Sequence, residues 1–65
     1  MKVTWDPEVD VLRILLGDAP IEESDEDKPF VILDYDKEGN VVGLEILEAS
    51  KRTSNPRSAE YAVTR

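Results

Sequence analysis

Apolar and polar residues alternate in two short runs near the start of the chain. Val3 and Trp5 lie on one side of the first run, and the second run, Val11–Leu16, continues the alternation. A period of two residues predicts β-strands, and Pro7–Asp10 has the residue types of a four-residue turn. The result is a hairpin in which Trp5 pairs with Leu12. One face of this hairpin is entirely apolar: Val3, Trp5, Leu12, Ile14 and Leu16.

Two further runs, Phe30–Asp36 and Val41–Leu47, are rich in the β-branched and large apolar residues that strands favour. The loop between them, Asp36–Gly39, ends on a glycine that can adopt a positive φ angle. A four-residue loop predicts the pairs Tyr35 with Asn40, Leu33 with Val42 and Val31 with Leu44. The apolar face of this second hairpin then holds six side chains: Val31, Leu33, Tyr35, Val42, Leu44 and Ile46.

The opposite faces of the two hairpins also carry large apolar residues: Val11, Leu15, Phe30, Ile32 and Val41. A sheet face that meets water does not usually display so many. We therefore expect a helix or a second copy of the chain to cover them, and we predict a homodimer or higher homo-oligomer.

The remaining segments are more polar. Gly17–Pro29 links the hairpins, and its run Glu22–Asp27 is almost entirely acidic, so we expect only a short edge strand around Ile21–Ser24. Glu45–Arg52 predicts one or two helical turns that end on cations, and Asn55-Pro56 interrupts whatever precedes it.

These elements predict a mostly β fold of the small α+β type. It is an antiparallel meander of two hairpins with one short C-terminal helix, in a single domain over residues 1–52. We expect residues 53–65 to form a flexible basic tail, with a short helix over Ser58–Val63 as the alternative.

Composition limits how such a small fold is stabilised. The chain has 65 residues and neither cysteine nor histidine, so disulfides, thiolate chemistry and the usual zinc ligands are excluded. A domain of this size buries only about 60% of the surface of its unfolded chain. Small domains therefore usually need an additional source of stability, such as disulfides, a metal ion or oligomerisation. Of these, oligomerisation is the one that remains for this chain.

The net charge of −7 is unevenly distributed: residues 1–49 carry −10 and residues 50–65 carry +3. An acidic body repels phosphate backbones, so we expect no nucleic-acid binding except through the basic tail. The acid serves solubility or attracts a basic protein partner. No apolar run approaches the about 20 residues that span a bilayer, and the first residues lack the apolar stretch of a signal peptide. We therefore expect a cytoplasmic protein without a membrane partner.

The stretch Asp34–Glu45 nearly matches the twelve-residue calcium loop of an EF-hand. Its candidate ligands at positions one, three, five and twelve are Asp34, Asp36, Glu38 and Glu45. Glutamate at position five is longer than the usual residue, and the flanking segments are strand-like. A hairpin would carry Glu45 about 10 Å beyond the loop. We expect no metal site here and no cofactor site elsewhere.

Catalytic chemistry also lacks a sequence signal. A serine nucleophile would have only lysine or a carboxylate as its base, and paired carboxylates need a cleft that shifts their pKa. The three glycines are isolated, so there is no phosphate-binding loop. We predict that the protein is not an enzyme and has no catalytic residue. Trp5 is either a core residue or an aromatic anchor at an interface.

Four segments in order, Met1–Glu8, Leu12–Ile14, Val31–Asp36 and Val41–Ser50, resemble the small bacterial and archaeal family named domain of unknown function 2283. The resemblance covers roughly residues 1–52. Trp5 stands where the family often has tyrosine, and Arg13 where it often has an aromatic residue. Family members often accompany small basic proteins that look like toxins, which implies an antitoxin-like role. The resemblance supplies no catalytic residue.

Three functional hypotheses follow. The first is a small protein-interaction module, antitoxin-like, that binds a basic protein partner. The second is a structural homo-oligomer without a ligand, whose acid serves only solubility. The third is a calcium-binding hairpin at Asp34–Glu45.

Overall fold

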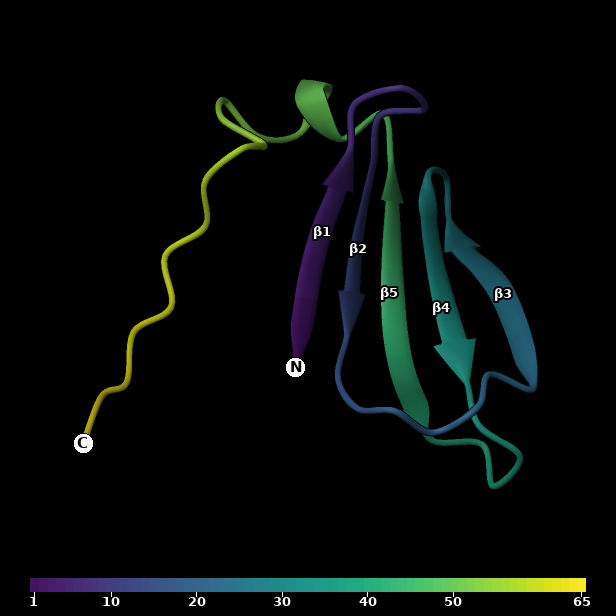
Figure 1. Ribbon diagram of the computed structural model, residues 1–65. Coiled ribbons are helices and arrows are strands. Elements are labelled where there is room, and N and C mark those ends of the chain that lie inside the picture. Colours follow the sequence, from purple (N-terminus) through teal and green to yellow (C-terminus); the bar gives the residue numbers. More distant parts are fainter.

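Five strands form one antiparallel sheet in the computed structural model, which describes residues 1–65 (Figure 1). The strands are β1 (Lys2–Asp6), β2 (Val11–Leu15), β3 (Glu23–Lys28), β4 (Val31–Tyr35) and β5 (Val41–Leu47). Their order across the sheet is β1-β2-β5-β4-β3, so the last strand of the chain lies at the centre. The predicted mostly β fold is confirmed.

Both predicted hairpins are present, and β5 joins them by pairing with β2. The acidic link does contain an edge strand, but it spans Glu23–Lys28 rather than Ile21–Ser24. All six residues of β3 are exposed. Backbone pairing with β4 therefore determines this strand, because none of its own side chains is buried.

The first hairpin has the predicted register, with Trp5 opposite Leu12. Its four-residue turn is fixed at both ends. Asp6 Oδ1 accepts a hydrogen bond from the backbone N–H of Glu8 at 2.9 Å, and Asp10 adopts a positive φ of 56°. Aspartate tolerates this left-handed conformation better than most residues.

The predicted register of the second hairpin is wrong by two residues from Val31 to Asp34 and by one residue at Tyr35. Tyr35 pairs with Val41 and Asp34 pairs with Gly43, so Val42 is an extra residue in a β-bulge. The carbonyl of Val42 still accepts a hydrogen bond from the N–H of Leu16 at 2.9 Å, so the bulge leaves β5 attached to the chain beyond β2. Because side chains alternate with a period of two, the two-residue shift between Val31–Asp34 and Gly43–Ile46 changes partners but not faces.

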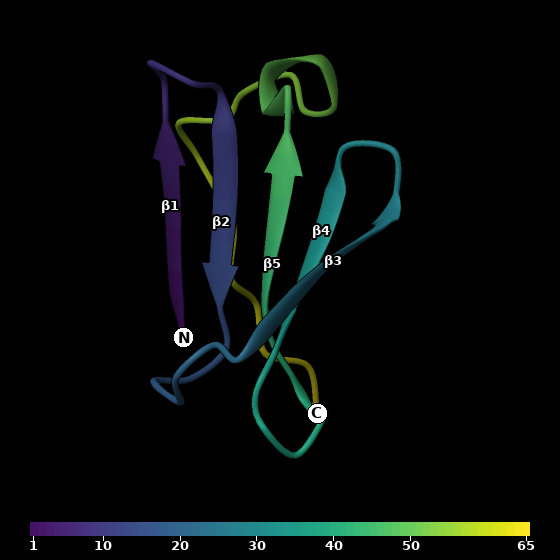
Figure 2. The same ribbon diagram turned by 90° about the vertical axis from the view of Figure 1, so that its right-hand side faces the viewer.

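The sheet has one predominantly apolar face and one mixed face. The apolar face, called here the tryptophan face, holds Val3, Trp5, Leu12, Ile14, Val31, Leu33, Leu44 and Ile46. The other, called here the aspartate face, holds Val11, Arg13, Leu15, Ile32, Asp34, Glu45 and Leu47. No second layer of strands or helices covers either face (Figures 1 and 2).

The predicted C-terminal helix is a single 3-10 turn, η1 (Ala49–Lys51). β5 continues to Leu47, and Glu48 then takes a left-handed conformation with φ 51°, which reverses the chain before an α-helix can begin. Residues 53–65, called here the C-terminal segment, form no strand or helix. The alternative helix over Ser58–Val63 is thus absent, and the flexibility of the segment remains a prediction.

Candidate functional site

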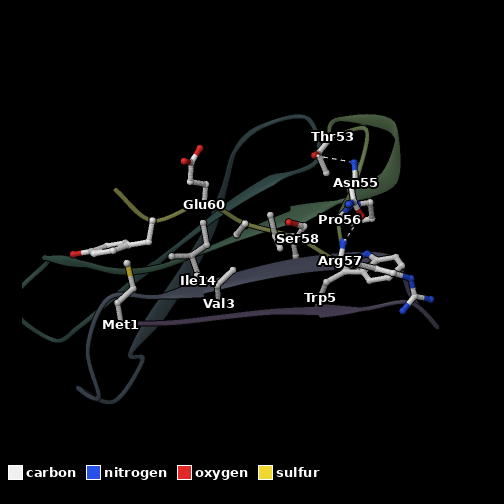
Figure 3. Close-up of a pocket in the computed structure, with 13 residues that line it drawn as sticks. Met1, Val3, Trp5, Ile14, Thr53, Asn55, Pro56, Arg57, Ser58 and Glu60 are labelled. Carbon is white, nitrogen blue, oxygen red and sulfur yellow. Dashed lines mark hydrogen bonds between the residues drawn. The ribbon is translucent and has the colours of Figure 1, made fainter. Parts of the chain in front are cut away.

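The tryptophan face and the C-terminal segment enclose a groove of about 770 Å³. The floor is apolar and comes from β1, β2 and the N-terminal residue: Met1, Val3, Trp5, Leu12 and Ile14. The wall is the chain from Thr53 to Tyr61, which passes over these strands (Figure 3). The volume lies in the range of small-ligand pockets, about 300–1,000 Å³. However, the polar groups that would orient a small ligand are confined to the wall, so the groove is better described as an apolar surface partly covered by a strap.

Trp5 lies at one end of this groove and makes two contacts there. The guanidinium carbon of Arg57 lies 5.2 Å from the centroid of its ring, within the range of a cation–π interaction (Figure 3). Its indole Nε1–H donates a hydrogen bond to Asp10 Oδ1 at 2.9 Å. Trp5 is therefore half-buried by its own chain, and its fixed orientation makes it a preorganised part of the apolar face.

Asp10 links the first turn to the end of the sheet. Besides the indole of Trp5, its carboxylate accepts hydrogen bonds from the Ser50 hydroxyl at 2.6 Å and the Ser50 N–H at 3.0 Å. Its carbonyl accepts one from the N–H of Ala49 at 3.0 Å. The hydrogen bonds from the Ser50 hydroxyl and the Trp5 indole hold the pKa of Asp10 below its usual value. The role of Asp10 is thus structural.

Acidic residues border the tryptophan face along β3. Glu23 pairs with Tyr35 and Asp25 pairs with Leu33, so both acidic side chains lie on the side of the sheet that carries Leu33. At the opposite edge, over β1, lies the cationic side chain of Arg57. The apolar face therefore has an acidic border on one side and a basic group on the other.

The aspartate face contains a buried carboxylate. Asp34 is completely buried, and its Oδ1 accepts a hydrogen bond from the Ser24 hydroxyl at 2.6 Å. No donor reaches its Oδ2. A buried acceptor without a partner destabilises a fold by about 1–3 kcal/mol. Such an atom requires a physical explanation.

Glu45 is the acidic neighbour of Asp34. It lies two residues beyond Gly43 on β5, within hydrogen-bonding reach of the Asp34 carboxyl group. On its other side, Glu45 Oε1 is 3.4 Å from Nη2 of Arg13 on β2. Burial, followed by the contact with Asp34, raises the pKa of Glu45, and Arg13 opposes that shift.

The four candidate calcium ligands do not gather into one site. Asp34 and Glu45 meet on the aspartate face, whereas Asp36 closes the turn. Asp36 Oδ1 accepts the N–H groups of Glu38 at 3.0 Å and Asn40 at 2.9 Å. These contacts, with that from Asn40 the largest, keep the pKa of Asp36 below its usual value. No group of three or more acidic side chains is placed to hold a metal ion.

Sequence reasoning missed the Asp34–Glu45 pair because of the bulge. The predicted register placed Glu45 opposite Phe30, whereas it lies opposite Ile32 and thus diagonal to Asp34. The available signal was Gly43: a glycine within an apolar strand often marks a bulge or a close approach. A Cβ atom on Gly43 would lie only 2.9 Å from Asp34 Oδ2.

The five apolar residues that were expected together on a covered second face do not all lie on one face of the sheet. Val11, Leu15 and Ile32 lie on the aspartate face. Phe30 lies in the turn between β3 and β4 with φ 69° and is 42% exposed, and Val41 is 41% exposed.

No helix of the protein is long and apolar enough to cross a membrane.

The fold and surface define a single-layer antiparallel sheet whose apolar face is covered only in part, by the C-terminal segment. The chain belongs to the family of proteins of unknown function DUF2283, which matches residues 2–50. The match includes all five strands and ends within η1. No curated protein and no solved structure matches the chain.

Proposed function

We propose that this protein is a small protein-interaction module that binds a protein partner on its tryptophan face. The observation that carries the proposal is the lack of a core. Only Asp34, Gly43 and Ala49 are buried in the whole chain. None of the apolar side chains of the tryptophan face is fully buried, and Val3 is 44% exposed. A sheet normally buries such a face against a second layer.

The accessible area supports the same proposal. The chain exposes 5275 Å², about a quarter more than the roughly 4,200 Å² expected for a folded monomer of its mass. The excess is about 1,100 Å². It is comparable to the about 800 Å² that each partner buries in a standard protein–protein interface.

The charge indicates what kind of partner fits. The net charge is −7, and Glu23 and Asp25 border the apolar face. A basic protein would meet apolar contacts at the centre of this surface and opposite charge at its β3 border, which accelerates association. An antitoxin-like neutraliser of a basic protein is the biological role that this chemistry favours.

Affinity capture from native lysate at low and high salt tests the proposal. A basic protein identified at low salt is then purified and its binding measured with the double variant E23Q/D25N. We expect slower association and a weaker salt dependence than with the wild type. The double variant E8Q/D18N changes the net charge equally, but neither side chain borders the face, so it serves as the control.

Equal effects of the two double variants would show that only net charge matters, and would contradict recognition at this face. If no basic protein is enriched at low salt, the proposal of a basic partner fails. A captured partner that is harmless when expressed alone would contradict the antitoxin-like role while leaving the binding intact.

A second candidate is a structural homo-oligomer, and the distribution of charge on the tryptophan face favours it. A two-fold axis parallel to the strands would place the acidic border of one copy over the Arg57 side of the other. With the C-terminal segment moved off the strands, the two apolar faces would then meet as a sandwich, about 10 Å apart. Sedimentation equilibrium tests this candidate: a dimer mass that falls with added salt supports it, and a monomer mass at high protein concentration contradicts it.

A further inference from the structure

The least explained atom of the structure is Oδ2 of Asp34. The side chain is completely buried, its other oxygen is bonded to Ser24, and Oδ2 has no donor. Oδ2 also lies on the β5 side of the carboxyl group, because a Cβ atom on Gly43 would be 2.9 Å from it. The group that approaches from β5 on this face is the carboxyl group of Glu45.

We propose that Asp34 and Glu45 form a proton-binding site in which the two carboxyl groups share one proton. A protonated carboxyl group is a hydrogen-bond donor, so a proton on Glu45 supplies the donor that Oδ2 lacks. It also removes the repulsion between two carboxylates in contact. The proton comes from solvent, since the Glu45 side chain remains partly exposed.

The charged groups around the pair determine how it is held once the proton has left. Arg13 on β2 contacts Glu45 from the side away from Asp34. Glu26 on β3 lies opposite Ile32 and adds negative charge to the same face, and Lys2 on β1 lies opposite Leu15, at the far end of the row that contains Asp34. Arg13 is therefore the one cation in contact with the pair. Once the proton leaves, Glu45 is held by Arg13, and the buried Asp34 oxygen loses its donor.

The site thus links protonation to the pairing of the central strands. Glu45 lies on β5 and Asp34 on β4, so the shared proton bridges the two strands. The raised pKa of Glu45 is consistent with this geometry. The direction of the pH dependence of stability follows from this raised pKa. The stability contributed by the shared proton is complete below the usual pKa of glutamate and is lost as the pH rises through the higher pKa of the folded state.

The test is the thermal midpoint of wild type and E45Q from about pH 4 to pH 8. The glutamine amide that this variant introduces donates a hydrogen bond to Asp34 at every pH, so it imitates the protonated pair. We expect E45Q to equal the wild type at low pH and to melt several degrees higher at pH 8. E38Q, which removes an exposed turn carboxylate, is the control, and its difference from the wild type should not follow this profile.

A carboxyl ¹³C NMR titration of the wild-type protein provides a readout that needs no variant. We expect the pKa of the Glu45 side-chain carboxyl to lie above its usual value of 4.5. Titration at or below that value, or an E45Q protein that is less stable than the wild type at pH 8, would overturn the proposal. So would a rise of the wild-type midpoint on addition of millimolar Ca²⁺ or Mg²⁺ that E45Q lacks, because a cation rather than a proton would then occupy the site.

Discussion

Asp34 lies directly opposite Gly43 on the neighbouring strand, and the missing side chain of Gly43 gives the buried carboxyl group its space. A Cβ atom at this position would be 2.9 Å from Asp34 Oδ2 and 3.3 Å from both the Ile14 carbonyl and Leu15 Cδ2. Two of these three neighbours belong to β2, so the position is enclosed from both sides. The glycine is therefore required by close packing, since its φ angle is not positive.

We predict that Gly43→Ala destabilises the protein by about 1–3 kcal/mol, the usual range for overpacking. Gly17→Ala is the matched control, because nothing lies within 4 Å of its Cβ position and its φ is not positive. That substitution should be neutral or stabilising by up to about 1 kcal/mol. Urea denaturation of both variants measures the difference, and equal midpoints would contradict the close approach at Gly43.

Asp10→Asn should lower the thermal midpoint by several degrees at neutral pH, because the charge that strengthens the bonds to Ser50 and Trp5 is lost. The lowered pKa of Asp10 sets the pH dependence. Its contribution is complete above the usual value of 3.8 and is lost as the pH falls through the pKa of the folded state. The difference from the wild type should therefore vanish in acid. Asp18→Asn, at a carboxylate without a hydrogen bond, should show no such profile.

Arg57→Gln should have a small effect on stability, about 0.5–1 kcal/mol at most, because the cation–π contact with Trp5 is exposed. The fluorescence of Trp5, the sole tryptophan, should nevertheless change, since the cation over its ring is removed. Unchanged fluorescence would show that the C-terminal segment does not rest on Trp5 in solution.

The parts of this fold that neighbouring residues determine could be predicted from the sequence, provided that those residues carry a recognisable signal. The first hairpin was predicted with its register because alternation and the turn at Pro7–Asp10 agree. The bulge at Val42 was missed, because Val41 and Val42 are both suitable strand residues and the one signal beside them, Gly43, was not used. The left-handed Glu48 gives no signal in the sequence, so the short helix after β5 was overestimated.

The rest was fixed by contacts between distant segments. β3 is a strand only because β4 pairs with it, and its acidic residues have low strand propensity. The pairing of β2 with β5 follows from no local pattern. The Asp34–Glu45 pair depends on the bulge register, so it was found only as two members of a calcium motif that the fold does not assemble.

The central claim is that the tryptophan face is the binding surface, and two adjacent residues of β2 test it most directly. Ile14 lies on the tryptophan face and Leu15 on the aspartate face. Each is replaced by lysine, and affinity is measured for the captured partner, or for a second copy if the protein dimerises. Circular dichroism first confirms that both variants are folded. We predict that Ile14→Lys abolishes association and Leu15→Lys preserves it. Loss with Leu15→Lys and retention with Ile14→Lys would contradict the account and place the interface on the aspartate face.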